Sequence, residues 1–133
     1  MLLDTNIVSY FYRRDTRAAL YERHLFGQPR YIAFMTLGEL YKWPLERNWG
    51  PQRRADLENY LCSYVVLPYD DALARTWASL SASAKQRGRI LGYADSWIAA
   101  TALRHDLTLI THNSRDFAGI EGLKLWTQAP AGG

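Results

Sequence analysis

The sequence has few of the residues and motifs that build disulfides, zinc sites or nucleotide-driven enzymes. Its single cysteine, Cys62, can form no internal disulfide and has no partners for a cysteine-based zinc site. The three histidines, His24, His105 and His112, lack the H-E-x-x-H spacing of a zinc hydrolase. Neither G-x-x-x-x-G-K-S/T nor G-x-G-x-x-G is present, which weighs against nucleoside-triphosphate and dinucleotide chemistry. The acidic residues remain as the main candidates for chemistry.

Long apolar runs are also absent, and lysine is scarce. No run approaches the roughly 18 residues of a membrane span, and Asp4 interrupts the N-terminus before a signal-peptide core can form. We therefore expect a cytoplasmic protein that does not associate with membranes. Only three of the sixteen basic residues are lysines, and the arginines that dominate suit phosphate or carboxylate groups. The net charge of +3 permits nucleic-acid binding without requiring it.

The composition is that of an ordinary globular protein, with 48% hydrophobic and 22% charged residues in a chain of 133. This predicts one domain over residues 1–127, followed by a flexible C-terminal tail at 128–133. Strand-like runs are predicted at 1–3, 31–35, 65–67, 107–111 and 125–126, with helical patterns between them. The alternation of strands and helices predicts an α/β fold whose mainly parallel sheet is covered on both faces.

Local signals predict where individual helices begin and end. Thr36 followed by Glu39 matches a capping box and predicts that a helix opens at this point. Pro44 predicts that the same helix ends or kinks near Trp43, because proline lacks a backbone N–H and crowds the preceding turn. Pro51 is suited to the first turn of the next helix.

Acidic side chains follow the predicted strands at points that can converge in space. Asp4 comes after the first strand, Glu39 after the second, and Asp95 at a helix start, while Asn113 and Asp116 follow the strand at 107–111. In parallel α/β sheets, sites lie beyond the carboxyl ends of the strands. Clustered carboxylates repel one another unless a cation compensates, and oxygen-only ligands favour Mg²⁺ or Mn²⁺ over Zn²⁺. Such an ion suits phosphoryl chemistry, including phosphodiester hydrolysis.

Each of these residues also has a purely structural interpretation. Asp4 and Asp95 can cap or charge-complement the helices that they precede or begin. Glu39 can complete the local capping box, and Asn113 and Asp116 can shape a turn. For each residue alone, the structural interpretation is about as good as a functional one. The hypothesis of a metal site therefore depends on these residues occurring together.

The same segments resemble the PIN-domain family, and more narrowly the VapC-type ribonuclease toxins of bacterial toxin–antitoxin pairs. The resemblance is carried by LDTN at 3–6, TLGEL at 36–40, DSWIAA at 95–100 and THNSRDF at 111–117. It spans almost the whole chain in the expected order. It implies a three-layer α/β/α sandwich, an endoribonuclease that depends on Mg²⁺ or Mn²⁺, frequent homodimerisation and inhibition by a cognate VapB-like antitoxin.

Carried over residue by residue, the resemblance identifies Asp4, Glu39 and Asp95 as the core metal-binding acids. Asn113 stands where many members have an acid, so it is expected to act as an auxiliary catalytic residue, with Asp116 as its alternate. Three further positions match residues that are expected to support the site by hydrogen bonds to the carboxylates: Thr5, Asn6 and Thr111. The chain departs from the family's pattern at 41–44, where larger residues follow Glu39 and Leu40.

Two other functions remain open at this level. Because Asn113 replaces an expected acid, the chain can instead be a PIN-like module that binds RNA or protein without cutting. A carboxylate-metal phosphatase acting on small molecules would use the same chemistry on a different substrate. Trp43 and Trp49 are candidates for a partner surface, whereas Trp77 and Trp97 are expected to pack in the core or a dimer interface.

Overall fold

A parallel sheet forms the centre of the molecule. The computed structural model describes residues 1–129, and within that part the sheet has five strands in the order β3-β2-β1-β4-β5. The strands are β1 (Leu2–Leu3), β2 (Tyr31–Ala33), β3 (Val65–Leu67), β4 (Leu109–Ile110) and β5 (Leu125–Trp126). Every neighbouring pair is parallel. The expected α/β fold is confirmed. The predicted tail at 128–133 lies largely outside the described residues and stays a prediction.

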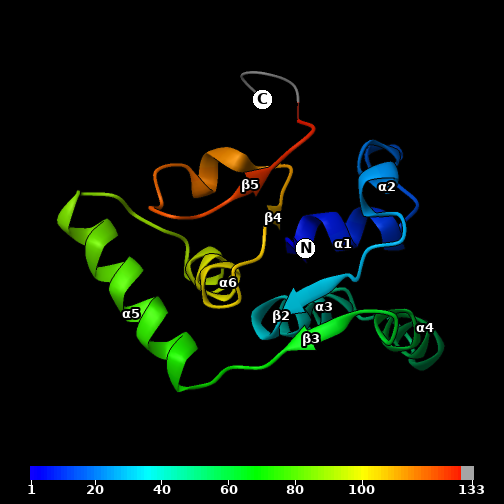
Figure 1. Cartoon of the computed structure of the whole chain (residues 1–133). Coiled ribbons are helices and arrows are strands. Elements are labelled where there is room, and N and C mark those ends of the chain that lie inside the picture. Colours follow the sequence, from blue (N-terminus) through cyan, green and yellow to red (C-terminus); the bar gives the residue numbers. More distant parts are fainter. Residues whose placement is uncertain (130–133) are drawn as a thin grey trace.

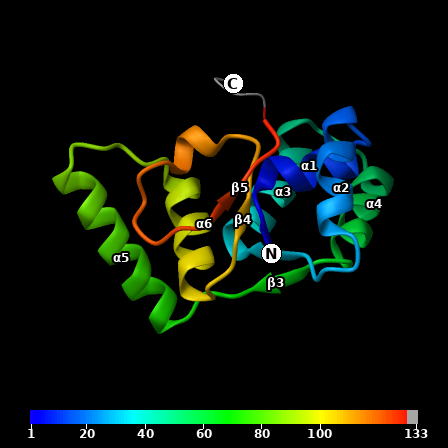
Figure 2. The same ribbon diagram turned by 45° about the horizontal axis from the view of Figure 1, so that its top comes forward.

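Helices cover both faces of this sheet (Figures 1 and 2). They are α1 (Thr5–Tyr12), α2 (Ala19–Leu25), α3 (Phe34–Glu46), α4 (Pro51–Leu61), α5 (Asp71–Gln86) and α6 (Tyr93–Arg104), with short 3₁₀ turns η1 (Thr16–Ala18) and η2 (Ser114–Phe117). In Figure 2, α5 and α6 lie on one side of the strands, and α1, α2 and α4 lie on the other. The arrangement is the three-layer α/β/α sandwich that the sequence predicted.

The two-residue period of the strands divides the core into two clusters. Leu3, Ile32 and Ile110 point into one cluster, together with buried side chains of α1, α2, α3 and α4. Their neighbours Leu2 and Leu109 point the opposite way, with Ala33, and pack against α6 and η2. Because successive strand side chains alternate between faces, each short apolar run fills both layers.

Helix α3 differs at both ends from the sequence prediction. It begins at Phe34, with Ala33 in an extended conformation before it and no side-chain cap, so the predicted capping box at Thr36 and Glu39 is wrong. Thr36 lies inside the first turn, and the Thr36 and Glu39 side chains contact Thr5 of another helix instead. The helix continues past Pro44 to Glu46, so it does not end near Trp43 as predicted. The Pro44 ring is buried, and its packing with the rest of the chain is a contribution that the local sequence does not reveal.

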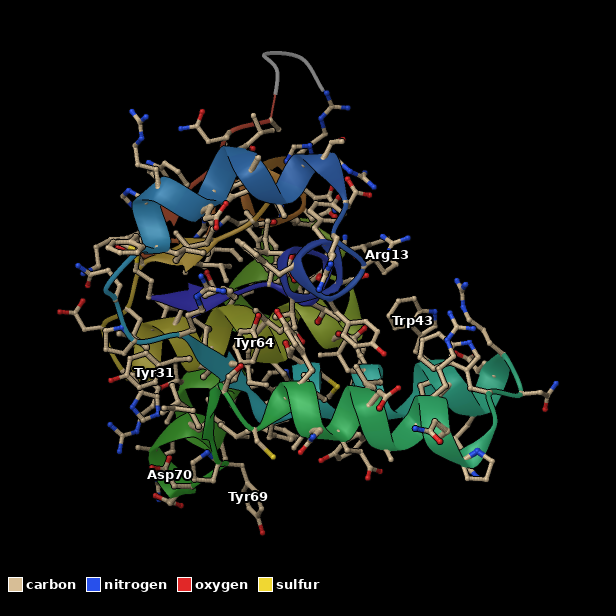
Figure 3. All side chains as sticks on the ribbon, turned by 90° about the vertical axis from the view of Figure 1, so that its right-hand side faces the viewer. Arg13, Tyr31, Trp43, Tyr64, Tyr69 and Asp70 are labelled. Atoms are coloured by element: carbon tan, nitrogen blue, oxygen red, sulfur yellow. The ribbon has the colours of Figure 1, made fainter. Side chains whose placement is uncertain are left out.

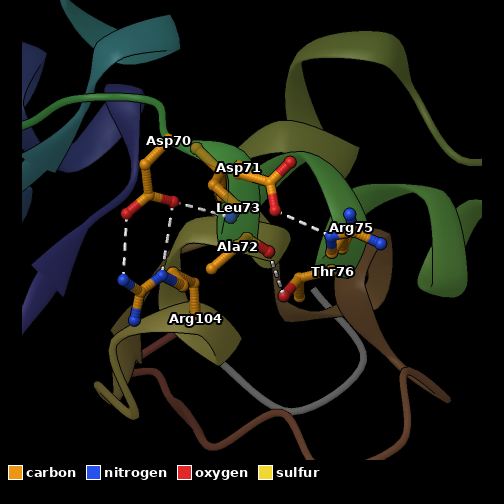
Figure 4. A network of polar contacts seen from close by, with 7 residues as sticks. All are labelled: Asp70, Asp71, Ala72, Leu73, Arg75, Thr76 and Arg104. Carbon is orange, nitrogen blue, oxygen red and sulfur yellow. Dashed lines mark hydrogen bonds and ion pairs between the residues drawn. The ribbon is translucent and has the colours of Figure 1, made fainter.

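A polar network fixes the start of α5 against the end of α6 (Figure 4). The Asp70 carboxylate accepts the Leu73 backbone N–H at 2.7 Å and so caps α5. It also pairs with the Arg104 guanidinium of α6 at 2.9 Å. Further along, the rings of Trp77 and Trp97 stack at 4.7 Å and bind the two helices to each other, as expected for packing residues. None of the helices within residues 1–129 has the length and apolarity needed to span a membrane.

Candidate active site

The predicted site residues lie around one end of the central strands. After β1 the chain adds β2 and β3 on one side of that strand, and β4 and β5 then follow on its other side. The strand order therefore reverses between β1 and β4. A parallel sheet leaves a crevice beyond its carboxyl edge at such a point. Asp4 directly follows β1, and its backbone N–H donates to the Ile110 carbonyl of β4 at 2.9 Å. Residues 111–113 continue from β4 at the same edge.

Asp4 is a buried carboxylate that also caps α1. Its side chain is only 5% exposed. Oδ1 accepts the Thr5 backbone N–H at 2.8 Å, and Oδ2 accepts the Thr111 hydroxyl at 2.8 Å. Burial is the largest cause that raises the pKa of Asp4 to about 6; the charges of Asp95 and Glu39 act in the same direction, and the two hydrogen bonds act against it. The capping role of Asp4 is therefore confirmed, and it coexists with an electrostatic connection to two other acids.

Thr5 connects Glu39 to the Asp4 end of the site. The Thr5 hydroxyl donates to Glu39 Oε1 at 2.7 Å, and the hydroxyl of the fully buried Thr36 lies 3.1 Å from it. Since α1 starts directly after Asp4, one residue holds both acids, because the Thr5 backbone N–H donates to Asp4 and the Thr5 hydroxyl donates to Glu39. The structure thus gives Thr5 and Thr111 hydrogen bonds to two of the acids.

Asp95 lies in the first turn of α6 and faces other carboxylates. It is partly buried, and burial raises its pKa, with the charges of Asp116 and Glu39 as further causes. None of the hydrogen bonds and ion pairs within residues 1–129 involves the Asp95 carboxylate. Mutual repulsion therefore links four acids, Asp4, Glu39, Asp95 and Asp116. Asp4 and Asp95, whose pKa values are raised, therefore resist ionisation in the absence of a cation.

The loop after β4 distinguishes Asn113 from Asp116. The Asn113 backbone N–H donates to the Thr111 hydroxyl at 3.0 Å, while its side chain makes no capping bond to η2. The single turn of η2 brings Asp116 back toward α6, close enough for its charge to raise the Asp95 pKa. The structure therefore connects Asp116, the alternate of the sequence prediction, to the acidic cluster. For Asn6 it shows only that the residue lines a groove beside Glu39.

Arg89 is a residue of the site region that sequence reasoning missed. Its guanidinium donates to the backbone carbonyls of Arg115 at 3.2 Å and Asp116 at 3.1 Å, and also to that of Ala118. These bonds tie the α5–α6 loop to η2, which carries Asp116. In the sequence Arg89 belongs to a basic cluster that is typical of a solvated surface, and no local signal marks it as the cap of a distant turn.

Replacing Arg89 is expected to loosen η2. Arg89→Gln removes a charged donor that serves three carbonyls, and each bond from a charged group contributes about 1.5–3 kcal/mol. Hydrogen exchange at the Asp116 and Ala118 amides should accelerate by about tenfold or more. Arg87→Gln is the matched control, because Arg87 donates to Gly119 beyond that turn and to Ser83 of α5, and pairs with Glu121 at 4.0 Å, without contacting η2 in the described part of the chain. Equal exchange in both variants would show that Arg89 does not hold η2.

The donor chemistry of the cluster suits a hard divalent cation. Its oxygen atoms belong to carboxylates, and the buried Asp4 has no ion pair with a basic residue within the described part of the chain. In residues 1–129, however, no three His, Cys, Asp or Glu side chains are placed closely enough to hold one metal ion together. In this part of the chain the acids therefore act on one another through their charges.

Comparisons with known proteins agree with this arrangement. The PIN domain family matches residues 1–123. VapC ribonuclease Y4jK of Sinorhizobium fredii is 31% identical over 140 residues, covering 97% of this chain and 99% of that protein. The tRNA(fMet)-specific endonuclease VapC of Shigella flexneri is 33% identical over 125 residues, covering 92% and 93%. The structure of VapBC-1 from nontypeable Haemophilus influenzae matches with a TM-score of 0.83 and 26% identity, covering 95% of this chain and 96% of that chain.

These relatives match the chain over nearly its full length. The chain therefore belongs to the PIN-domain family, as a VapC-type ribonuclease toxin of the VapBC toxin–antitoxin systems.

Proposed function

We propose that the protein is an endoribonuclease that hydrolyses internal phosphodiester bonds at the acidic cluster, with Mg²⁺ or Mn²⁺ as cofactor. The observation that carries this proposal is the buried Asp4 carboxylate at the carboxyl edge of the sheet, which has no basic partner among the described residues and has Glu39 and Asp95 as charged neighbours. The raised pKa values of Asp4 and Asp95 show that the cluster is costly to ionise by itself. Carboxylates gathered without a compensating cation destabilise the fold. A protein that keeps such a destabilising group of charges commonly does so at a functional site.

Asp4, Glu39 and Asp95 are the residues that would hold the ion. When bound, a divalent cation would offset their charges, orient a water and polarise the phosphate. Thr111 and the Thr5 backbone fix the Asp4 carboxylate, and the Thr5 hydroxyl fixes Glu39. Held in this way, the side chains lose little conformational freedom during the reaction.

Asp116 is assigned a separate task in this proposal. Its carboxylate lies near Asp95 and is not needed to hold the ion, so it can orient the attacking water and accept its proton. Asn113, whose backbone holds Thr111 in place, shapes the loop around it.

The experiment that tests this function is RNA cleavage by the purified protein with Mg²⁺, with Mn²⁺ and with EDTA, followed by sequencing of the RNA ends. Because the Shigella relative is named for a transfer RNA, the substrate set includes tRNAs besides unstructured RNA. New internal ends that disappear with EDTA support the proposal. Metal-independent binding without cleavage would favour a binding module. Hydrolysis of a phosphate monoester together with inertness toward RNA would favour a phosphatase.

Substitutions in the loop after β4 test which residue completes the site. Asp116→Asn removes the charge that acts on Asp95 and is expected to lower the cleavage rate by about 10²-fold, within the range for general acid–base groups. Asn113→Ala keeps the backbone bond to Thr111 and is expected to cost less than about tenfold. Single-turnover rates on one RNA measure both variants. The reverse order of effects would assign the role to Asn113.

A VapB-like antitoxin is the proposed protein partner. The Haemophilus structure that this fold resembles is that of a VapBC protein. Large apolar side chains that a partner can cover are exposed at Phe26 (83%), Ile90 (96%) and Tyr93 (70%). A homodimer, which the sequence also led us to expect, is part of the same proposal. Sedimentation of the protein alone and with its antitoxin measures both.

A further inference from the structure

A groove of about 300 Å³ runs from the acidic cluster along α1 and α3. Thr5, Asn6 and Glu39 line it near the cluster, and Arg13, Trp43 and Arg47 line it farther out. Two other cavities of comparable or larger size lie beside α5, and neither is lined by any of the four acids. An RNA strand cut at the cluster must extend beyond the cleaved phosphate. Because Glu39 of the cluster also lines this groove, the strand can continue along it.

The guanidinium groups of two exposed arginines lie near one indole ring in this groove. The Arg13 guanidinium lies 5.7 Å from the centre of the Trp43 ring, and that of Arg47 lies 5.0 Å from it. Figure 3 shows Arg13 and Trp43 next to each other at the same side of the molecule. The Trp43 ring is itself held by Trp49, whose ring centre is 5.1 Å away. Cation–π contact of this kind orients a guanidinium without using its hydrogen-bond donors.

The donors of these arginines are available to a ligand. Within residues 1–129, neither Arg13 nor Arg47 takes part in an ion pair of 4.0 Å or less. Glu46 also lines the groove, but Lys42 lies 3.8 Å from its carboxylate and offsets its charge. The outer part of the groove is therefore positive, in contrast to the acidic cluster at its inner end. A planar guanidinium with free donors is suited to a phosphate.

We propose that Arg13 and Arg47, oriented by Trp43, form a subsite for a backbone phosphate of the RNA that lies along the groove from the cleaved one. The subsite rests on the proposed endoribonuclease function. It explains how a polyanion approaches four acids, because attraction at the outer groove offsets repulsion at the inner end. Arg13 and Arg47 bind substrate, and Trp43 acts through them as a positioning residue.

The test measures RNA binding separately from cleavage. In an Asp95→Asn background, which is expected to be inactive, a fluorescently labelled single-stranded RNA is titrated and its anisotropy followed at several salt concentrations. Adding Arg13→Gln and Arg47→Gln is expected to weaken binding at least about tenfold at low salt. The slope of log affinity against log salt should fall by about 0.7, the contribution of the one phosphate of a single strand that the two arginines neutralise.

Matched variants separate the subsite from general charge. Arg23→Gln with Arg75→Gln removes the same two charges from α2 and α5, away from the groove, and should leave the slope within error of the parent. Arg13→Lys with Arg47→Lys keeps the charge and should retain the slope, with weaker binding because the planar fork is lost. Trp43→Leu should weaken binding and leave the slope nearly unchanged. Equal slopes for the groove pair and the control pair would overturn the subsite.

The remaining outcomes distinguish the subsite from the function on which it rests. If the wild-type protein cleaves no RNA under any metal condition, the proposed function fails. If it cleaves RNA and the Arg13→Gln, Arg47→Gln pair binds as tightly as its parent, the subsite alone fails. An Asp/Glu-rich peptide serves as a second ligand. Binding of that peptide that depends on Arg13 and Arg47, together with RNA binding that does not, would overturn the subsite and identify a protein-docking groove.

Discussion

Asp4→Asn is expected to abolish RNA cleavage and to leave the protein folded, with a higher free energy of unfolding near pH 8. Asparagine is also a good helix N-cap, so its side-chain oxygen can still accept the Thr5 backbone N–H. Its amide group can donate to the Thr111 hydroxyl oxygen that now faces the carboxylate. What the variant loses is the negative charge.

The expected loss of activity is large. Charge stabilisation by a bound metal ion contributes several kcal/mol to a transition state, and 1.36 kcal/mol corresponds to a factor of ten in rate. Without the Asp4 carboxylate, the cleavage rate should fall by about 10³-fold or more. Single-turnover cleavage measures the loss, and circular dichroism verifies the fold.

A surface aspartate provides the control for this prediction. Asp56 lies exposed on α4, away from the acidic cluster, and Asp56→Asn removes the same charge. It should leave cleavage within about twofold of the wild-type rate, as expected for a surface substitution. Undiminished cleavage by Asp4→Asn would refute the assignment of Asp4 to the active site.

The stability of the wild-type protein without divalent cations is expected to fall as the pH rises from about 4 to about 6. The pKa of Asp4 is raised from 3.8 to about 6 by burial. Between these values the folded protein keeps a proton that the unfolded chain releases, so the free energy of unfolding decreases with pH. Asp4 therefore stabilises the fold below pH 4, and this contribution is lost by about pH 6. At 1.36 kcal/mol per unit, it amounts to about 3 kcal/mol.

Other carboxylates act in the opposite direction at lower pH. Hydrogen bonds and charge from Arg17 lower the pKa of Asp15, and those from Arg104 lower the pKa of Asp70. Their stabilising contributions are present above their unfolded pKa, near 4, and are lost in more acidic solution. Both groups remain in the Asp4→Asn variant, so the difference between the two proteins isolates Asp4.

Urea unfolding at pH 4.5, 6.0 and 7.5 measures this difference. The free energy of unfolding of Asp4→Asn, relative to wild type, should increase across this range and level off above about pH 6. Adding Mg²⁺ or Mn²⁺ at pH 7.5 should restore stability to the wild type and much less to the variant, because a ligand that binds only the folded state stabilises it. A constant difference at all pH values, or equal stabilisation of both proteins by the ions, would contradict the proposed role of Asp4.

The strands and the helix order could be predicted because they depend on local pattern. The runs at 65–67 and 125–126 are strands in the structure, and those at 1–3, 31–35 and 107–111 contain the shorter strands 2–3, 31–33 and 109–110. Pro51 begins a helix, as proline at the first turn commonly does. The start and end of α3 could not be predicted in the same way. Thr36 and Glu39 have the spacing of a cap, but their side chains interact with Thr5, which is more than thirty residues away in the chain.

The loop after β4 shows the same limit at the site. From the sequence, Asn113 occupies the position where the family often has an acid, and Asp116 is only a nearby alternate. In the structure, one turn of 3₁₀ helix and three carbonyl contacts with Arg89 turn Asp116 toward Asp95. The residues around Asp116 do not indicate either interaction in the sequence. Arg89 comes from the loop before α6 and Asp95 from the first turn of α6, and both lie earlier in the chain.

The sequence by itself determined the layered α/β architecture and the family, since periodic hydrophobicity and short motifs are local properties that folding preserves, and it predicted three acids for the site. Only the tertiary structure decided which hydroxyls hold these acids, how their charges interact, and that two arginines surround an indole in the adjoining groove. Hydrogen bonds and charge interactions depend on distances of a few ångströms between side chains. Packing of the whole chain sets those distances, and the order of residues does not record them.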